Sequence, residues 1–245
     1  MNYIYSLILL TAIIGTGSSA QAAPKAHKYS LNVGRFDKIN VVENLNVVFR
    51  SHPDSIGMIA FRGDEKVADA LLFSNNNGSL KIQIDNPENE SLDFPVIYAY
   101  SDFLTSATSS SEGIVRIEGN LAVPKFSAKL IGNGSLTVTG INANQVDASL
   151  MTGNGTMVLE GSTSKANFRV VGTGLINADA LQAETVKCNF MGGGTLGCWP
   201  IKTLDIRGIG TTRIYYKGTP QIKKVGGGKI YPLTSGSLTE QTIEE

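Results

Sequence analysis

A Gly-x-Gly step recurs six times between residues 132 and 228 and constrains the fold more than any other feature of this chain. The second glycines of successive steps are 21, 19, 20, 16 and 18 residues apart, and each step separates two segments of alternating apolar and polar residues. A period near 20 residues is typical of a repeat architecture, in which each unit packs against its neighbours. The first five steps contain Gly132 and Gly134, Gly153 and Gly155, Gly172 and Gly174, Gly192 and Gly194, and Gly208 and Gly210.

Aligning the chain on the second glycine of each step places apolar residues in columns. Leu136, Met157, Ile176 and Leu196 follow it by two residues, and Val138, Leu159, Ala178 and Cys198 follow it by four. A period of two is that of a β-strand, and like positions in stacked coils lie about 4.8 Å apart. The sequence therefore predicts an all-β fold, a parallel β-helix (β-solenoid) with coils of roughly 20 residues. We expect a right-handed coil, because crossovers between parallel strands are almost always right-handed.

The glycines are predicted to lie at the corners of the coils. A corner needs glycine where a Cβ atom would collide with the next coil or where the backbone takes a positive φ angle. In the unit that ends at Gly155 the apolar residues around Val146 are out of phase, which indicates one inserted residue and a β-bulge. A β-propeller is disfavoured, because its blades need about 40–50 residues.

The rest of the chain is arranged around this repeat region. Residues 1–22 contain a short apolar core followed by Ala20-Gln-Ala22, which is typical of a secretory signal peptide. No later segment is apolar enough to span a membrane as a helix. We predict a signal peptide (1–22), a leader (23–34), one β-helix domain (35–232) with an N-terminal cap of strands and a possible short helix (about 35–94, helix at 66–73), and a flexible acidic tail (233–245).

Composition and charge limit the function classes. Lys plus Arg and Asp plus Glu both number 21, so the net charge is zero, and the basic residues do not cluster. A neutral chain lacks the electrostatic field that gathers nucleic acid. We therefore expect no nucleic-acid partner.

Motifs that could carry chemistry are sparse. Gly192–Gly197 formally matches the dinucleotide fingerprint G-x-G-x-x-G, which functions only when the loop opens a helix, and here a strand is expected to follow. His27 and His52 are the only histidines, and neither has metal-ligand spacing. The acidic residues of the repeats fall at differing coil positions, which argues against a facing pair of catalytic carboxylates. We expect no enzymatic activity, no cofactor and no metal.

The two cysteines, Cys188 and Cys198, both fall on inward-facing columns. An exported protein can pair two such thiols in a disulfide. Ten residues of separation, however, place them on opposite sides of the coil, and a disulfide needs Cα atoms within about 7 Å. A disulfide in a thin coil and two buried free thiols both remain open.

Several segments resemble a known family. Phe36-Asp-Lys-Ile, the strand Gly78-Ser-Leu-Lys-Ile and the run of strand-Gly-x-Gly-strand units are similar to the head GIN domain, or putative auto-transporter adhesin, family. The closing Ile214-Tyr-Tyr-Lys-Gly-Thr-Pro220 is also similar, so the resemblance covers about residues 35–232. It implies an exported bacterial protein with a β-helix fold.

These patterns lead to one expectation and two alternatives for function. We expect an exported, non-enzymatic β-solenoid that acts as an adhesin-like binding or scaffold module at the cell envelope, in the periplasm, on the outer-membrane surface or outside the cell. Its contacts would come from exposed polar residues such as Asn133, Asn154 and Thr173, and its partner would be a glycan or a surface protein. The alternatives are a carbohydrate-active solenoid enzyme and a protein that self-assembles through the solenoid ends.

Overall fold

The computed structural model describes residues 26–86, 88, 91–110 and 112–233, which form one nearly all-β body. The predicted signal peptide and nearly all of the predicted tail lie outside these residues. The N-terminal elements are β1 (His27–Asn32), β2 (Lys38–Val42), β3 (Val47–Ser51), η1 (Pro53–Ser55), β4 (Met58–Gly63), α1 (Glu65–Asp69), β5 (Leu71–Asn76), β6 (Ser79–Ile84), β7 (Ile97–Ser101), β8 (Ser106–Ser110) and β9 (Ile114–Glu118). The later strands are β10 (Leu121–Ile131), β11 (Ser135–Met151), β12 (Thr156–Gly172), β13 (Leu175–Gly192), β14 (Thr195–Gly210), β15 (Arg213–Tyr216), β16 (Gln221–Gly226) and β17 (Lys229–Pro232).

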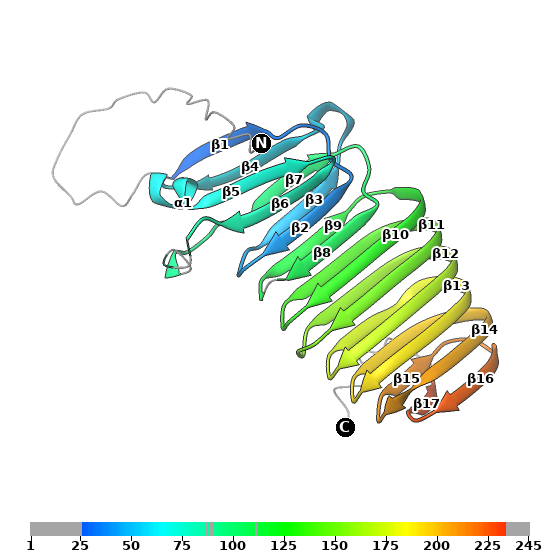
Figure 1. Ribbon diagram of the computed structural model, residues 1–245. Coiled ribbons are helices and arrows are strands. Elements are labelled where there is room, and N and C mark those ends of the chain that lie inside the picture. Colours follow the sequence, from blue (N-terminus) through cyan, green and yellow to red (C-terminus); the bar gives the residue numbers. More distant parts are fainter. Residues whose placement is uncertain (1–25, 87, 89–90, 111, 234–245) are drawn as a thin grey trace, which may run out of the picture.

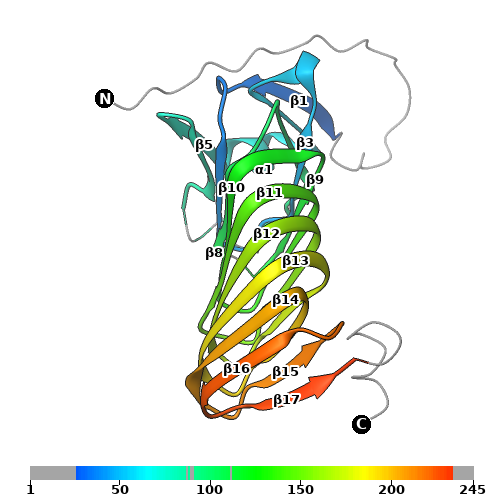
Figure 2. The same cartoon turned by 90° about the vertical axis from the view of Figure 1, so that its right-hand side faces the viewer.

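The strands stack into a flattened solenoid with two faces (Figure 1). Each long strand contributes to both faces: the start of β11 pairs with β9, whereas the rest of β11 pairs with β10. The first face contains β3, β9, the starts of β11 to β14, β15 and β17, and the second contains β2, β8, β10, the ends of β11 to β14, and β16. All of these pairs are parallel. Figure 2 shows the long strands bending from one face to the other.

The interior is filled by the predicted columns. Leu136, Met157, Ile176 and Leu196 are aligned by strand pairing and are fully buried between the two faces. Alternate residues of every long strand point inward, which gives each coil one continuous apolar layer. The predicted fold class, an all-β solenoid, is confirmed.

The two glycines of a corner step have different roles. The first adopts a positive φ angle, as at Gly172 (φ +113°), a conformation that residues with a Cβ atom rarely adopt. The second lies against the previous coil: a Cβ atom on Gly174 would come within 2.5 Å of the Gly155 carbonyl oxygen. The predicted step therefore needs glycine twice, once for backbone conformation and once for close approach.

The register of the last coils differs from the sequence alignment. Gly192 pairs with Gly210, so the fifth corner is Gly210-Thr211-Thr212 and not Gly208-Ile209-Gly210. Gly208 instead lies within β14 opposite Phe190, where a Cβ atom would meet the Phe190 ring at 2.7 Å. Thr212 takes the place of the second corner glycine, is buried, and donates a hydrogen bond from its hydroxyl to the Gly192 carbonyl at 3.1 Å. Sequence alignment on glycine alone missed this substitution.

The predicted bulge is present in the coil that contains β11. Val138 pairs with Leu159 and Ile141 with Gly161, so the bulged strand has one residue more than its partner between these pairs. Gly140 lies in the bulge with φ +75°. The inserted residue is thus absorbed where the chain passes from the first face to the second.

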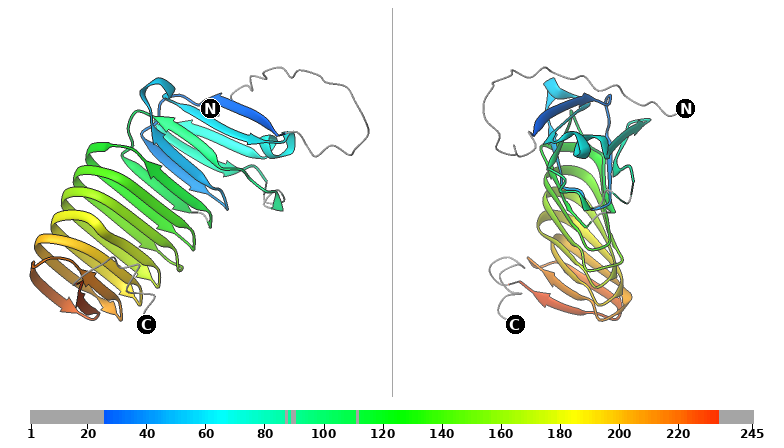
Figure 3. Two further views of the ribbon diagram at one scale, coloured as in Figure 1. Left: turned by 180° about the vertical axis from the view of Figure 1, so that it is seen from behind. Right: turned by 90° about the vertical axis from the view of Figure 1, so that its left-hand side faces the viewer.

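The N-terminal cap mixes parallel and antiparallel strands (Figure 3). β1 pairs with β4, β4 with β7, and β5 with β6, all antiparallel, whereas β2 and β3 continue the parallel stack. The predicted leader is not separate from the domain, because residues 27–32 form β1. The helix is also shorter than expected. It ends at Asp69, and Leu71–Phe73 belong to β5, where pairing with β6 overrides the helical spacing of the apolar residues.

Candidate functional site

One corner column carries the residues expected to make contacts. Asn133, Asn154 and Thr173 are the middle residues of three successive glycine steps, and all three are exposed. They are also tied to one another: the Asn133 side-chain oxygen accepts a hydrogen bond from the Asn154 backbone N–H at 3.1 Å, and the Thr173 hydroxyl contacts the Asn154 side chain. The column is therefore an ordered polar ladder that runs along the solenoid.

The opposite corner carries a shallow groove, which we call the corner groove. Asn142, Ser162 and Gln182 are aligned across three coils and are exposed on its floor. Glu184 and Lys202 form an ion pair of 2.9 Å at one side. The volume is about 400 Å³, and the groove is open and mostly polar. Such a surface suits an extended polar ligand better than a small apolar molecule, which needs an enclosed pocket.

The last two coils have a different surface, which we call the terminal depression. Tyr215 and Tyr231 stack with ring centroids 5.1 Å apart and an interplanar angle of 23°. Arg213 and Lys229 lie beside them, and Thr211 and Gly193 complete the lining of a depression of about 400 Å³. None of these residues was identified as a site residue from the sequence.

Basic residues gather at this end of the solenoid, although the whole chain is neutral. Residues 199–233 contain one acidic residue, Asp205, and seven basic ones. The expectation that basic residues do not cluster is therefore wrong for the last coils. The seven are Lys202, Arg207, Arg213, Lys217, Lys223, Lys224 and Lys229.

The acidic residues of the repeats are spread over both faces and are mostly paired with cations. Glu118 binds Arg50 at 3.0 Å, and Asp179, which is 6% exposed, lies 3.6 Å from Lys217. Partial burial alone would raise the pKa of Asp147, but hydrogen bonds from Asn167, Lys125 and Gln145 outweigh it, and the pKa is lowered. Four of the six repeat carboxylates, those of Glu118, Asp147, Asp179 and Glu184, thus already have a cationic partner.

The other sequence motifs have structural roles. The glycine run at 192–197 forms a corner and leads into β14, a strand, as expected. His52 caps η1, because its Nδ1 atom accepts a hydrogen bond from the Asp54 backbone N–H, while His27 is exposed in β1. Within the described part of the chain, no group of His, Cys, Asp and Glu side chains has a geometry that could hold a metal ion.

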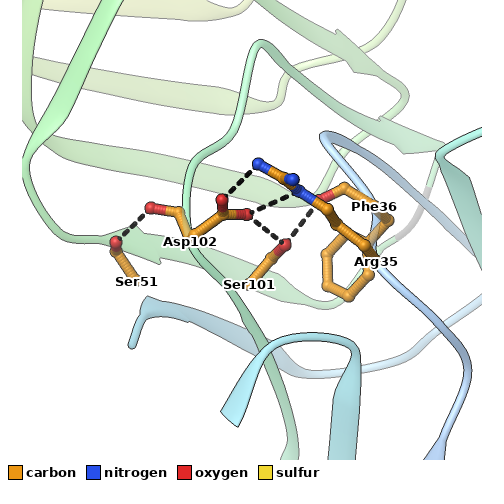
Figure 4. A network of polar contacts seen from close by, with 5 residues as sticks. All are labelled: Arg35, Phe36, Ser51, Ser101 and Asp102. Atoms are coloured by element: carbon orange, nitrogen blue, oxygen red, sulfur yellow. Dashed lines mark hydrogen bonds and ion pairs between the residues drawn. The ribbon is translucent and has the colours of Figure 1, made fainter. Parts of the chain in front are cut away.

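A polar network fastens the cap to the solenoid (Figure 4). Arg35 forms an ion pair with Asp102 and stacks over Phe103 at 5.2 Å. The buried Ser101 hydroxyl donates a hydrogen bond to the Phe36 carbonyl at 2.6 Å. These contacts join the start of the domain to the turn between β7 and β8. The network is buried or internally paired, so we assign it to stability.

Both cysteines are buried, and both thiols are free in the structure. Cys188 lies on the second face and Cys198 on the first, as the sequence predicted. Burial raises the pKa of Cys188 to about 12 and also raises that of Cys198. The structure thus corresponds to the alternative with two buried thiols.

We expect iodoacetamide to label neither Cys188 nor Cys198 in the folded protein, and both after unfolding without reductant. Stability should also fall as pH rises from about 9 towards 12, because the unfolded thiols ionise in that range while the folded ones stay protonated. Mass spectrometry and chemical unfolding at several pH values measure the two effects. An unfolded, unreduced protein that takes up no label would instead reveal a disulfide.

Comparison with solved structures supports the fold. A putative adhesin from Bacteroides fragilis is 22% identical, with a TM-score of 0.76 over 86% of this chain and 98% of that chain. A putative lipid binding protein from Parabacteroides distasonis is 21% identical, with a TM-score of 0.65 over 85% and 97%. A putative adhesin from Parabacteroides distasonis is 16% identical, with a TM-score of 0.67 over 86% and 98%. At these identities the likeness shows a shared fold.

Sequence comparison identifies the family directly. No curated protein gives a significant match to the chain. The family described as "Putative auto-transporter adhesin, head GIN domain" matches residues 35–220, which is most of the chain. This range begins just before β2, so it contains the cap except for β1, the first five glycine corners and the corner groove. The chain therefore belongs to the putative auto-transporter adhesin, head GIN domain family.

Proposed function

We propose that this protein is an exported, non-enzymatic binding module that mediates adhesion at the bacterial cell envelope. One observation carries the proposal: exposed polar side chains continue in register across three coils of the corner groove. Parallel strand pairing fixes their spacing, so little conformational freedom is lost when a ligand binds. The family description and the adhesins among the structural neighbours support the same role.

Export is part of the proposal. It rests on the signal-peptide pattern of residues 1–22 and on the family description. Among the described residues, no helix is long and apolar enough to cross a membrane. Fractionation of cells that produce a C-terminally tagged protein tests this part. We expect the tag in the envelope fraction or the medium, and a tag confined to the cytosol would contradict it.

Binding is tested with an array of envelope glycans and surface proteins probed with the purified protein. We expect at least one class to bind, and the variant N142A/S162A/Q182A to weaken that binding by about tenfold, because several polar contacts are lost together. The matched control S149A/N189A changes outward polar residues of the second face and should bind normally. Equal binding by the groove variant and the control would place the contact elsewhere.

The absence of turnover is measured on the same ligands. Any glycan that binds is incubated with the protein and then analysed by chromatography. We expect it to be recovered intact, because the carboxylates Glu118, Asp147, Asp179 and Glu184 are each engaged by a cation. Cleavage of more glycan molecules than there are protein molecules in the sample would support the alternative of a carbohydrate-active enzyme.

A further inference from the structure

The terminal depression is built from a tripeptide that occurs twice. Arg213-Ile214-Tyr215 of β15 and Lys229-Ile230-Tyr231 of β17 are adjacent parallel segments in register. Ile214 is fully buried, so the central residue continues the inward column while the cation and the tyrosine lie on the outer side. The molecule therefore presents two cations side by side next to two stacked aromatic rings.

The last two coils differ from the four coils before them in this respect. The outward positions that precede Arg213 in its row hold neutral residues, and so do the four that precede Tyr215, although Arg116 of β9 lies before them in that row. They are Ser135, Thr156, Leu175 and Thr195 in the first row, and Thr137, Val158, Asn177 and Gly197 in the second. Since the same backbone positions hold uncharged, non-aromatic residues in the four preceding coils, the solenoid does not need cations or aromatic rings there to fold.

The paired cations carry a cost in the unliganded protein. Like charges directly opposite on neighbouring strands destabilise a sheet. The side chains of Arg213 and Lys229 are exposed and form no ion pair or hydrogen bond with any residue that the structure describes. Lys202 and Lys217 nearby do have acidic partners, Glu184 and Asp179. A bound anion would remove the repulsion between Arg213 and Lys229.

The tyrosines indicate that a ligand of the terminal depression has more than a negative charge. Tyr215 and Tyr231 are both partly exposed and combine an apolar ring with a hydroxyl group. β17 pairs only with β15 among the described strands, so the stack ends at Tyr231. An aromatic ring at the edge of a polar depression packs against the C–H face of a sugar, and its hydroxyl bonds to sugar hydroxyls. A simple inorganic anion would use neither property.

We propose that the terminal depression binds an acidic saccharide. A carboxylate or sulfate group accepts charge-assisted hydrogen bonds from Arg213 and Lys229, and the sugar ring packs beside Tyr215 and Tyr231. The Thr211 hydroxyl bonds to the ring substituents at the far side. The proposal depends on the proposed binding role of the protein, and it concerns a different surface from the corner groove.

Calorimetric titration of the purified protein at low salt tests the site. The probes are a hyaluronate hexasaccharide (carboxylate), a heparin hexasaccharide (carboxylate and sulfate), neutral chitohexaose and a short DNA duplex. We expect either or both acidic saccharides to bind, and chitohexaose and DNA to bind at least about tenfold more weakly, since each charge-assisted hydrogen bond contributes substantially. The acidic saccharide that binds more tightly identifies the preferred acidic group.

Two variants and one matched control decide whether the named residues are responsible. R213Q/K229Q is expected to weaken binding of the acidic hexasaccharide by about tenfold or more, and Y231L is expected to weaken it by about fivefold. The control K223Q/K224Q removes the same charge from strand β16, which lies on the second face, and its affinity should stay within about twofold of the unmodified protein. Thermal melting checks that all three fold, which is expected because these side chains are not buried.

Three results would overturn the proposal. The first is an equal loss of affinity in R213Q/K229Q and K223Q/K224Q, which indicates diffuse electrostatic attraction. The others are DNA binding as tight as that of the acidic saccharides, and no binding of either acidic saccharide. In the last case, continued glycan or protein binding that the corner-groove variant abolishes would leave the proposed function intact. Failure here is thus separable from failure of the binding role.

Discussion

Replacing Gly174 with valine is expected to destabilise the solenoid by roughly 2–5 kcal/mol, one of the largest effects available to a single substitution in this chain. A Cβ atom at this position would lie 2.5 Å from the Gly155 carbonyl oxygen and 2.9 Å from the Leu150 side chain. Leu150 could shift, but the Gly155 carbonyl accepts the hydrogen bond that joins the two coils at Leu175. Relief of the clash therefore breaks strand pairing. Urea or guanidinium unfolding measures the loss.

The matched control is Gly193→Ala at the middle of the next corner. A Cβ atom there would contact only Thr211 Oγ1 at 3.3 Å and Thr173 Cγ2 at 4.0 Å, and both belong to side chains. The equivalent position holds Asn133, Asn154 and Thr173 in earlier coils. We expect a change within about 1 kcal/mol, because reduced freedom of the unfolded chain offsets minor crowding. Equal losses at Gly174 and Gly193 would show that the corner is sensitive at every position and would contradict the division of roles.

Replacing Phe168 with alanine is expected to cost about 3–5 kcal/mol, because it opens a cavity in the middle of the solenoid. The ring is 1% exposed and is stacked in register between Ala148 and Cys188. Both neighbours are small, and parallel strand pairing holds their coils apart, so neither can fill the space. The free energy of unfolding from chemical denaturation measures the effect.

Two further variants test this explanation. Phe168→Leu keeps most of the volume and should cost about 1–2 kcal/mol. Arg169→Ala changes the exposed residue next to it and should be near neutral. If all three variants lose the same stability, packing of the Phe168 ring does not control the stability of these coils.

Much of the fold is predictable from the sequence because its interior repeats. Apolar columns, glycine corners and even the bulge near Val138 leave a trace at a fixed spacing, and stacking of coils is the direct consequence. Prediction fails where one residue replaces another of different type. Thr212 occupies the position of the second corner glycine and donates a hydrogen bond from its hydroxyl. An alignment that searches for Gly-x-Gly therefore assigns the corner to Gly208–Gly210, two residues too early.

The surfaces were harder to predict, since they depend on alignment across coils of unequal length. The corner groove is recognisable only when Asn142, Ser162 and Gln182 are known to be neighbours. The terminal depression left a usable signal, the repeat of a cation, isoleucine and tyrosine 16 residues apart, at 213–215 and 229–231. That spacing is shorter than the period of the central coils, because the last coil is shorter. The cap left no comparable signal, as β1 pairs antiparallel with β4.

The division of labour within the glycine corner has a consequence for how such proteins diversify. The two outer residues of the step are constrained by backbone geometry and are glycines except at Thr212, whereas the middle one, asparagine at 133 and 154 and threonine at 173, faces solvent. Each coil thus has one exposed corner residue that can change while the backbone of the coil stays the same. Duplication of a coil would lengthen the molecule by about 4.8 Å and add one such residue to the row. New specificities can then arise by substitution at these points while the stacking interactions stay unchanged.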